Sequence, residues 1–280
     1  MTSATPFRRN LLYVGADKAG SSWWHSVLSS HRQVVATTVK DPFFFDRHYQ
    51  RGLESYRALF DVPPHVGGPE VDSMVGLDVS HDYLYSGLAL ERIARDVAEP
   101  HLLVSVREPW SRTLSALAYL GRHRRVPESI AAAIAKFPET VERSLYAAPI
   151  ERAVRVFGRD RVRVVDFERI ATEPVRVADE VFTFAGLAAD DVAAAAIGRV
   201  RTASAPRWRP VGAALKTGAN AARAVGAYRA LEWAKSSPQL NAMAFRSSQT
   251  IGPAVIEPAL DALFSADPER LDDLLVTSFL

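Results

Sequence analysis

Short apolar segments alternate with helical segments along the first two thirds of this 280-residue chain. Five apolar runs have the length of buried strands, at residues 10–14, 34–39, 75–80, 101–106 and 161–170. Helical patterns separate or follow them, at residues 20–31, 52–60, 87–98, from Pro109 onward, 127–157 and 174–186. Strands that alternate with helices form a mainly parallel sheet with helices on both faces. The pattern therefore predicts a three-layer α/β fold.

The C-terminal part of the chain has a different composition. From Arg199 to about residue 248 it is rich in alanine and arginine, and helical stretches are joined by "TASAPRWRP" and "SSPQ". The chain contains no internal repeat and no segment typical of a linker between domains. We therefore predict a single domain over residues 1–280, with a core at about 10–190 and a helical C-terminal extension at about 199–280.

The composition excludes several classes of function. Without cysteine the chain can form no disulfide, thiolate zinc site, iron–sulfur cluster or cysteine nucleophile. Its formal net charge of +2 is too small for a polycation that coats nucleic acid. No run approaches the roughly 18 apolar residues of a membrane span, and the N-terminus lacks the apolar run of a signal peptide. We expect a cytoplasmic protein with no nucleic-acid partner and no integral membrane segment; its oligomeric state, monomer or homodimer, stays open.

The stretch "GADKAGSS", from Gly15 to Ser22, lies between the first predicted strand and the first predicted helix. A Walker A loop, G-x-x-x-x-G-K-[ST], has its lysine directly after the second glycine. Here Ser21 occupies that position, and Lys18 lies two residues before Gly20. The amides at the helix N-terminus can still bind an anion, with hydroxyls from both serines. Lys18 then suits a leaving phosphate oxygen better than a γ-phosphate; the alternative is an ordinary strand–turn–helix corner with a solvated lysine.

A second candidate anion site follows the fourth predicted strand. Arg107 stands at the carboxyl end of that strand, where open α/β sheets bind ligands. Ser115 follows eight residues later on a predicted helix, one turn beyond Ser111. A guanidinium and a hydroxyl together suit a phosphate group. The alternative is an ion pair between Arg107 and Glu108, with Ser115 packed away from it.

Together these two segments resemble the sulfotransferases that use 3′-phosphoadenosine 5′-phosphosulfate (PAPS). That family has a K-x-G-[ST]-[ST] loop that binds the 5′-phosphosulfate and an R-x7-S segment that binds the 3′-phosphate. One of the two tryptophans that open the first helix is expected to approach the adenine, and the other to pack on the sheet. By this resemblance the cofactor-binding residues are Lys18, Ala19, Gly20, Ser21, Ser22, Trp23, Arg107 and Ser115.

Two further segments extend the resemblance to bacterial and heparan-sulfate-type sulfotransferases over about residues 10–187. "KDPFFFDRHYQRGLESYRALF" is similar to the family's K-E-x-x-F-F-D…Y…G…W/Y, and "RVRVVDFERIATEPVRVADEVFTFAGL" to its strand, acidic turn and helix ending in F-L-G-L. The resemblance implies a P-loop-like fold and transfer of the sulfuryl group from PAPS to a hydroxyl or amine. It implies no metal, since positioning and charge neutralisation carry this type of transfer.

The acceptor is expected to be a small molecule, a glycolipid or a carbohydrate. The resemblance to the heparan-sulfate branch favours a sugar or polyol hydroxyl. The alanine- and arginine-rich composition is typical of GC-rich bacterial genomes, which favours a product of bacterial secondary metabolism. In the family the third strand ends in E-K-[ST]-P-x-Y, with a lysine that contacts the substrate; Val79 stands at that position. This difference argues against a polyanionic glycan as acceptor.

Two residues compete for the role of general base, and Lys18 completes the predicted catalytic set. In the heparan-sulfate branch a glutamate after the second strand deprotonates the acceptor, and Asp41 occupies that position. An aspartate is one methylene shorter, so the acceptor must bind closer; Asp41 could instead simply pair with Lys40. The rival base is His81, which replaces the family's proline at the exit of the third strand, beside Asp82.

Two other functions stay open on the sequence. One is a P-loop kinase or NTPase with a degenerate Walker A loop and residues 162–168 as its magnesium strand. The other is a non-catalytic module that binds a nucleotide or nucleic acid. Arg201, Arg207 and Arg209 lie where the sulfotransferases have a segment that closes over the nucleotide, so they are candidates for additional phosphate contacts. Interleaved arginine and tryptophan there also suit single-stranded nucleic acid, although the near-neutral net charge argues against it.

Overall fold

The computed structural model describes residues 4–62, 69–121, 125–127, 129–188, 204–206, 245–247 and 258–275. The chain divides into two compact units. The first comprises residues 1–107, 146–200 and 268–280, and the second comprises residues 108–145 and 201–267. All the strands predicted from the sequence belong to the first unit. The single domain with a helical extension stays a prediction.

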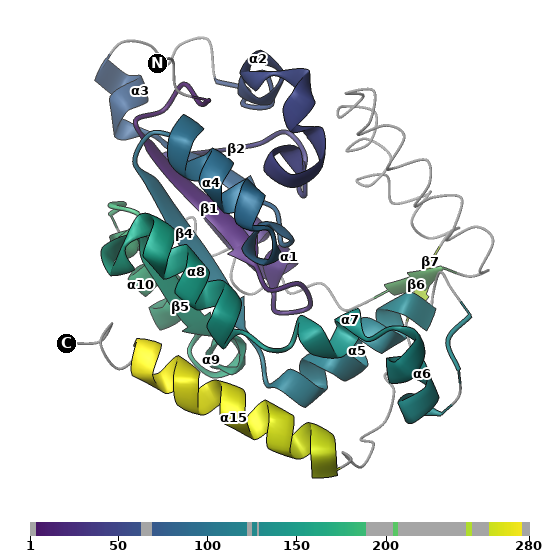
Figure 1. Ribbon diagram of the computed structural model, residues 1–280. Coiled ribbons are helices and arrows are strands. Elements are labelled where there is room, and N and C mark those ends of the chain that lie inside the picture. Colours follow the sequence, from purple (N-terminus) through teal and green to yellow (C-terminus); the bar gives the residue numbers. More distant parts are fainter. Residues whose placement is uncertain are drawn as a thin grey trace. The chain divides into compact units, whose positions relative to one another are not determined.

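Five parallel strands form the sheet of the first unit (Figure 1). They are β1 (Arg9–Gly15), β2 (Val34–Ala36), β3 (Val75–Val79), β4 (Pro100–Val106) and β5 (Val162–Asp166). Their order is β2-β3-β1-β4-β5, and every neighbouring pair is parallel. The predicted parallel sheet is confirmed. Because β1 lies between β3 and β4, the carboxyl ends of these three strands meet at one edge.

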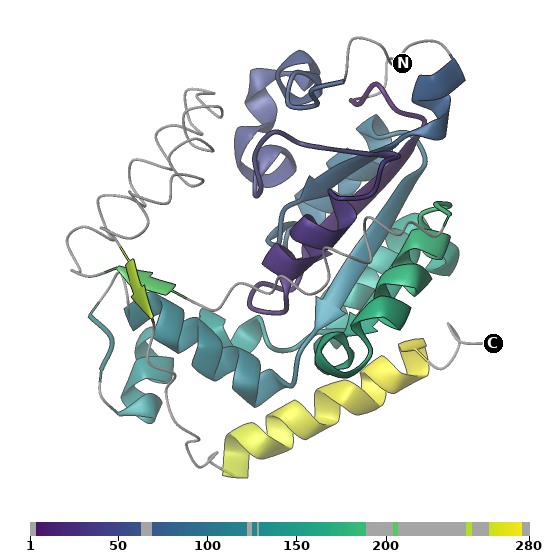
Figure 2. The ribbon, with the colours of Figure 1, turned by 180° about the vertical axis from the view of Figure 1, so that it is seen from behind.

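Helices cover both faces of this sheet. On one face lie α4 (Gly87–Asp96) and α8 (Ala147–Phe157), which contact each other (Figure 1). On the opposite face lie α1 (Ser21–Leu28) and α10 (Pro174–Phe184), seen from behind in Figure 2. Leu11 and Tyr13 of β1 join Val27 of α1 and Val181 of α10 in one buried cluster. The three layers predicted for a P-loop-like fold are confirmed.

Short helical segments fill the connections of the first unit. They are α2 (Leu53–Arg57), α3 (Pro69–Ser73), α9 (Phe167–Thr172), the π-helix η1 (Phe44–His48), and the 3₁₀ turns η2 (Tyr49–Arg51), η3 (Tyr83–Tyr85) and η4 (Arg159–Arg161). The π-helix was not predicted. It follows two residues with left-handed backbone, Asp41 (φ 60°) and Phe43 (φ 51°), and non-glycine residues give no sequence signal for that conformation.

Several elements are shorter than their sequence patterns. The strand predicted at 34–39 ends at Ala36; Thr37 still donates its amide to the carbonyl of Leu77 in β3 (2.9 Å) and also forms an antiparallel bridge to Phe60. The helix predicted at 20–31 ends at Leu28, and the one predicted at 52–60 ends at Arg57. The predicted stop at Gly186 is confirmed: this residue has φ 70°, a conformation that glycine adopts readily at a helix end.

The second unit contains α5 (Pro109–Gly121), α6 (Ile130–Lys136), α7 (Glu139–Glu142) and the antiparallel pair β6 (Ser204–Pro206) and β7 (Phe245–Ser247). Helix α15 (Pro258–Leu275) begins in the second unit, which includes residues up to 267. The helix-rich section around residues 127–157 is confirmed, whereas the strand pair was not predicted. Inside the unit, buried Arg112 donates a hydrogen bond to the carbonyl of Thr140 (2.8 Å).

Most of the alanine- and arginine-rich segment lies outside the described residues. This includes Arg201, Arg207 and Arg209, so their proposed phosphate contacts stay predictions. None of the helices that the structure describes combines the length and the apolar composition needed to cross a lipid bilayer.

Replacing Gly76 by alanine should destabilise the sheet. A Cβ atom at this position of β3 would lie 2.6 Å from Cδ2 of Phe7 and 2.7 Å from Oδ1 of Asn10. We expect Gly76→Ala to lower the free energy of unfolding by about 1–3 kcal/mol, the usual cost of overpacking a core. Gly121→Ala is the control, since its Cβ would meet only Val126 at 4.0 Å. Urea unfolding followed by circular dichroism measures both; equal shifts would contradict the packing described.

Candidate active site at the carboxyl ends of the strands

The loop that follows β1 is held from inside by a tyrosine. Tyr13 is fully buried, and its hydroxyl donates to the carbonyls of Ala16 (2.8 Å) and Ala19 (3.3 Å). The amide of Ala16 donates to the carbonyl of Ser105 at the end of β4 (2.9 Å). The loop is therefore attached to its own strand and to the neighbouring one. The sequence analysis missed Tyr13; a hydroxyl inside an otherwise apolar strand was the available signal.

The same loop opens the N-terminus of α1 toward a ligand. Lys18 (φ 64°) and Gly20 (φ 90°) both have left-handed backbone, which turns the chain into the helix. The helix has no side-chain cap, and its first internal hydrogen bond runs from the amide of Trp24 to the carbonyl of Gly20. The amides of Ser21, Ser22 and Trp23 consequently have no acceptor within the helix. Such an N-terminus suits an anion.

Arg107 lies against this loop. Its Nη1 is 3.4 Å from the carbonyl of Lys18, and its guanidinium carbon is 5.1 Å from the ring centre of Phe167. The same ring leaves no space beside Gly20, where a Cβ atom would lie 3.0 Å from Cδ2 of Phe167. The hydroxyl of Tyr146 donates to the carbonyl of Arg107 (2.9 Å) and holds its backbone. The guanidinium of Arg107 thus lies against the backbone of the loop that carries Lys18.

The arrangement fits a phosphorylated ligand. Nε of Arg107 is buried and has no hydrogen-bond partner among the described residues, and a buried donor of this kind calls for an acceptor. Together with the uncapped helix N-terminus, it leaves cationic and amide donors for an anion. Ser115 lies on α5 in the second unit, so its part in this site stays a prediction.

Glu108 was considered on the sequence as an ion-pair partner of Arg107, but the structure gives it another role. One carboxylate oxygen accepts the amide of Trp110 (2.8 Å) and the other accepts the amide of Ser111 (2.7 Å). Glu108 therefore caps the first turn of α5, as acidic residues do at helix N-termini. Its two oxygens are used by the backbone rather than by an arginine.

Both tryptophans at the start of α1 lie in the core. Trp24 is fully buried and Trp23 is 8% exposed, and their rings meet edge to face with centres 4.7 Å apart. The amide of Trp23 faces the anion site by its position in the first turn. A contact between its indole and the adenine stays a prediction.

The two candidate bases form one hydrogen-bonded pair. Nδ1 of His81 lies 2.7 Å from Oδ1 of Asp41, and Nζ of Lys40 lies 2.7 Å from Oδ2 of the same carboxylate. Both oxygens of Asp41 are therefore engaged. Nε2 of His81 is 3.9 Å from Oδ1 of Asp82, beyond hydrogen-bond distance. Asp41 pairs with Lys40, as considered on the sequence, but the same carboxylate also pairs with His81.

This pairing shifts both ionisations. Burial works to raise the pKa of Asp41, but the charges and hydrogen bonds of His81 and Lys40 outweigh it and hold that pKa well below its ordinary value. Burial works to lower the pKa of His81, but the charge and hydrogen bond of Asp41 raise it above its ordinary value. The pair therefore favours an ionised carboxylate and a more basic imidazole.

The pair lies next to the loop that carries Lys18. The amide of Asp41 donates to the carbonyl of Val79 at the end of β3 (2.9 Å). A Cβ atom on Gly15 would lie 2.9 Å from Cβ of Leu84 and 3.3 Å from the carbonyl oxygen of His81, so the two loops approach closely at this glycine. The predicted catalytic residues Lys18, Asp41 and His81 thus follow three strands, β1, β2 and β3, which are neighbours in the sheet.

An arginine borders the pair on its other side. The guanidinium of Arg47 lies 3.9 Å from the ring centre of Phe43, whose ring meets that of His81 edge to face. Arg47 also pairs with Asp82 and, at 3.2 Å, with Asp46. Burial raises the pKa of Asp46 to about 6, although the charge of Arg47 lowers it. Charges of both signs therefore surround the candidate bases.

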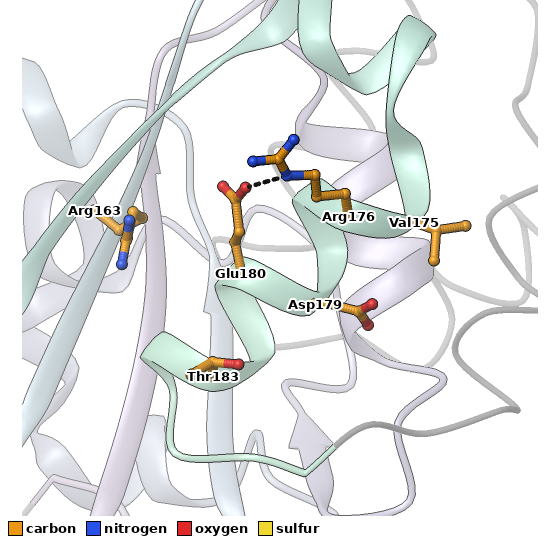
Figure 3. Close-up of a pocket in the computed structure, with 6 residues that line it drawn as sticks. All are labelled: Arg163, Val175, Arg176, Asp179, Glu180 and Thr183. Atoms are coloured by element: carbon orange, nitrogen blue, oxygen red, sulfur yellow. Dashed lines mark ion pairs between the residues drawn. The ribbon is translucent and has the colours of Figure 1, made fainter. Parts of the chain in front are cut away.

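A separate hollow of about 570 Å³ lies on the outside of the first unit (Figure 3). Its lining comes from the edge strand β5 and from α10, on which Arg176 and Glu180 form an ion pair one turn apart (3.4 Å). It contains none of the predicted site residues. Because this hollow is open and two of its lining residues form an ion pair with each other, it is a weaker candidate for a ligand site than the carboxyl ends of the strands. Among the described residues, no group of three or more histidine, aspartate or glutamate side chains is placed to hold a metal ion.

Comparison with protein families identifies the fold. The model of the sulfotransferase domain matches residues 8–201, more than half of the chain. The chain belongs to the sulfotransferase domain family. The solved sulfotransferase from Alicyclobacillus acidocaldarius superposes with a TM-score of 0.62 over 96% of each chain, at 23% sequence identity. This likeness supports the fold alone. The family match does not favour the P-loop kinase alternative.

Two human relatives are similar over part of their length. This sulfotransferase-family chain is 29% identical over 184 residues to heparan sulfate glucosamine 3-O-sulfotransferase 6, covering 63% of this chain and 52% of that protein. It is 26% identical over 200 residues to bifunctional heparan sulfate N-deacetylase/N-sulfotransferase 3, covering 63% of this chain and 22% of that protein. The chain thus spans about half of the first relative and about a fifth of the second.

His81 should remain protonated to higher pH than an ordinary histidine. Burial works to lower its pKa, and Asp41 raises it above 6.5, so Asp41→Asn should lower the pKa of His81. The raised pKa of His81 contributes stability that is fully present below its unfolded value of about 6.5 while Asp41 is ionised, and this contribution is lost as pH rises through the folded pKa of His81. Titration of the imidazole resonances by NMR, with His81→Gln for assignment, measures the shift. An unchanged pKa in Asp41→Asn would contradict the pairing.

Proposed function

We propose that this chain is a PAPS-dependent sulfotransferase that transfers the sulfuryl group to a hydroxyl or amine of a small-molecule, glycolipid or carbohydrate acceptor. The observation that carries the proposal is the meeting of Lys18 and Arg107 at one loop, next to the hydrogen-bonded pair of Asp41 and His81. Membership of the sulfotransferase domain family supports it. Neither a kinase nor a non-catalytic module gives this hydrogen-bonded pair a role.

The residues present suit PAPS as the donor. The 5′-phosphosulfate would be held by Lys18, the hydroxyls of Ser21 and Ser22 and the amides of residues 19–23, and the 3′-phosphate by Arg107. A contribution of Ser115 to the 3′-phosphate rests on the family resemblance alone. PAPS, when bound, supplies the sulfuryl group. Lys18 neutralises the negative charge that develops on the leaving phosphate oxygen, a task of electrostatic stabilisation by a fixed cation.

The proton of the acceptor goes to His81 in this proposal. Both oxygens of Asp41 are already engaged and its pKa is low, so it is a poor base. His81 has one ring nitrogen, Nε2, beyond hydrogen-bond distance of Asp82, and Asp41 raises its basicity. Asp41 then orients the imidazole and stabilises the imidazolium, as the aspartate of a Ser-His-Asp triad does. The sequence favoured Asp41 as base; the geometry favours His81 supported by Asp41.

The residues around the Asp41–His81 pair indicate which class of acceptor would bind there. The two human relatives are named for action on heparan sulfate. In this chain Val79, buried at the end of β3, occupies the position where the resemblance expected a lysine that contacts substrate. Asp46 and Asp82, near the Asp41–His81 pair, both form ion pairs with Arg47. An acceptor with little negative charge suits this surface better than a polyanion. A role in bacterial secondary metabolism and a cytoplasmic location stay predictions.

Nucleotide binding provides the first test. Calorimetric titration should show that adenosine 3′,5′-bisphosphate binds without magnesium and more tightly than ATP with magnesium. Arg107→Ala should weaken this binding about 10- to 100-fold, the worth of charge-assisted hydrogen bonds of about 1.5–3 kcal/mol. Arg163→Ala is the matched control, because this arginine also lies over an aromatic ring, that of Phe184 at 5.4 Å, and lines the outer hollow.

Lys18→Ala should instead lower turnover more than binding, since its charge serves the leaving oxygen. Preference for ATP with magnesium, or equal losses in the two arginine variants, would reject the proposed cofactor.

Variants of the base pair provide the second test. Asp41→Asn and His81→Gln should each lower turnover by about 10²–10⁴-fold, the usual worth of general-base catalysis. Because the two act as a unit, the double variant should lose little more than the worse single variant. Release of adenosine 3′,5′-bisphosphate from PAPS, with a panel of hydroxylated metabolites or water as acceptor, measures turnover.

His101→Gln is the matched control, since this ring meets Phe184 edge to face at 5.2 Å, as His81 meets Phe43 at 5.2 Å. Full turnover in His81→Gln, with Asp41→Asn inactive, would return the role of base to Asp41. Multiplying losses in the double variant would show that the two residues act independently.

A further inference from the structure

A buried carboxylate that the proposed reaction does not use lies beneath the candidate bases. Asp78 of β3 is 1% exposed and accepts three hydroxyl groups. Oδ1 accepts Ser80 (2.8 Å), and Oδ2 accepts Tyr56 (2.9 Å) and Tyr83 (3.1 Å). No lysine, arginine or histidine pairs with Asp78 in the described ion pairs. A buried carboxylate satisfied only by hydroxyls is a costly feature, which calls for a reason.

Two of the three hydroxyls also hold the loop that carries Asp41. Oγ of Ser80 accepts the amide of Phe43 (3.2 Å). The hydroxyl of Tyr83 accepts the amides of Phe44 (2.9 Å) and Phe45 (3.4 Å). Three successive amides of the loop therefore end on groups that donate to Asp78. The third hydroxyl, of Tyr56, donates to Asp78 and contacts no amide of this loop in the described hydrogen bonds.

The carboxylate decides the direction of these hydroxyl protons. An ionised carboxylate can only accept, so each hydroxyl must point its single proton at Asp78. The lone pairs of Ser80 and Tyr83 then face the loop and accept its amides. A group at position 78 that also donates, such as an amide, would compete for those lone pairs and leave a loop amide unsatisfied. The loss of a buried partner of this kind costs about 1–3 kcal/mol.

The loop needs such support because its backbone is unusual. Asp41 and Phe43 have positive φ, a conformation that costs roughly 1–3 kcal/mol for a non-glycine residue and persists only when the surroundings impose it. The amides of Phe43, Phe44 and Phe45 follow directly, and the ring of Phe43 contacts His81. A shift of the loop would therefore move the carboxylate of Asp41 relative to Nδ1 of His81.

We propose that Asp78 is a positioning residue, which through Ser80 and Tyr83 fixes the loop of residues 41–45 so that Asp41 meets His81. The inference rests on the proposed function insofar as that pair is the base. Three donors on one carboxylate favour its ionised form, against the burial that raises the pKa of Asp78 to about 7. Measurements at pH 8.5 therefore keep Asp78 ionised. Asp78 touches neither ligand nor reacting atoms; its effect passes entirely through the loop.

A pair of tyrosine variants tests this role. Tyr83→Phe and Tyr56→Phe each remove one hydroxyl that donates to Oδ2 of Asp78. The two tyrosines are buried to nearly the same extent. Only Tyr83→Phe also deprives the loop of an acceptor. If the cluster is merely structural, the two variants should have similar kcat and similar His81 signals. If Asp78 positions the loop, only Tyr83→Phe should change them. The Nδ1 proton of His81, hydrogen-bonded to a carboxylate, gives a far-downfield NMR signal that reports the pair without any turnover.

In the full chain at pH 8.5 we expect Tyr83→Phe to lose or shift this signal and to lower kcat about 10- to 100-fold, as small misplacements of catalytic groups do. Its affinity for adenosine 3′,5′-bisphosphate should stay unchanged. Tyr56→Phe should keep the signal and most of kcat. Equal behaviour of the two variants in the signal and in kcat would overturn the inference. If Tyr83→Phe does not fold, Ser80→Ala replaces it and is judged by the same two readouts.

The failure of this inference differs from the failure of the proposed function. A chain that releases no adenosine 3′,5′-bisphosphate from PAPS, yet loses the His81 signal only in Tyr83→Phe, has the positioning network without the proposed reaction. A chain that transfers the sulfuryl group, yet has the same signal in both tyrosine variants, has the reaction without the network.

Discussion

The parallel pairing of β1 with β3 and β4 is the constraint on which the site depends. Tyr13 of β1 lies opposite Val79 of β3, and Gly15 lies opposite Val104 of β4. Three chain exits therefore reach the same edge at nearly the same height. They carry Lys18, His81 and Arg107, which are far apart in the sequence. Without this register the cation of one loop, the imidazole of the next and the guanidinium of the third would not share one surface.

Buried tyrosine hydroxyls hold the polar loops at this edge. Tyr13 donates to the loop of Lys18, Tyr146 donates to the carbonyl of Arg107, and Tyr83 accepts the amides of Phe44 and Phe45. Each ring lies in the apolar core while its hydroxyl reaches the backbone of a loop. Such groups combine burial with hydrogen bonding, so the backbone groups that they contact are satisfied although the loops are irregular. The loops that carry the candidate site residues are thus supported from below.

The sequence predicted the parts of the site that are local in the chain. The spacing of Gly15, Lys18 and Gly20 indicated an anion loop at a helix N-terminus, and the place of Arg107 after a buried strand indicated a second cation. Both follow from strand and helix patterns that the structure confirms. The choice between Asp41 and His81 as base could not be predicted. These residues are 40 positions apart, and their contact depends on a left-handed loop that no sequence pattern announces.

By itself, the sequence determined the order of strands and helices and the parallel sheet, and it indicated a candidate anion loop, because hydrophobic periodicity and glycine spacing act over short stretches of chain. Only the tertiary structure decided that Asp41 and His81 form a pair, that Asp78 lies beneath their loop, and that both tryptophans of α1 are in the core. These outcomes depend on which segments become neighbours across the sheet and on which buried hydroxyls find an acceptor. Such contacts are long-range, and each is settled by packing and hydrogen-bond geometry that a linear pattern does not contain.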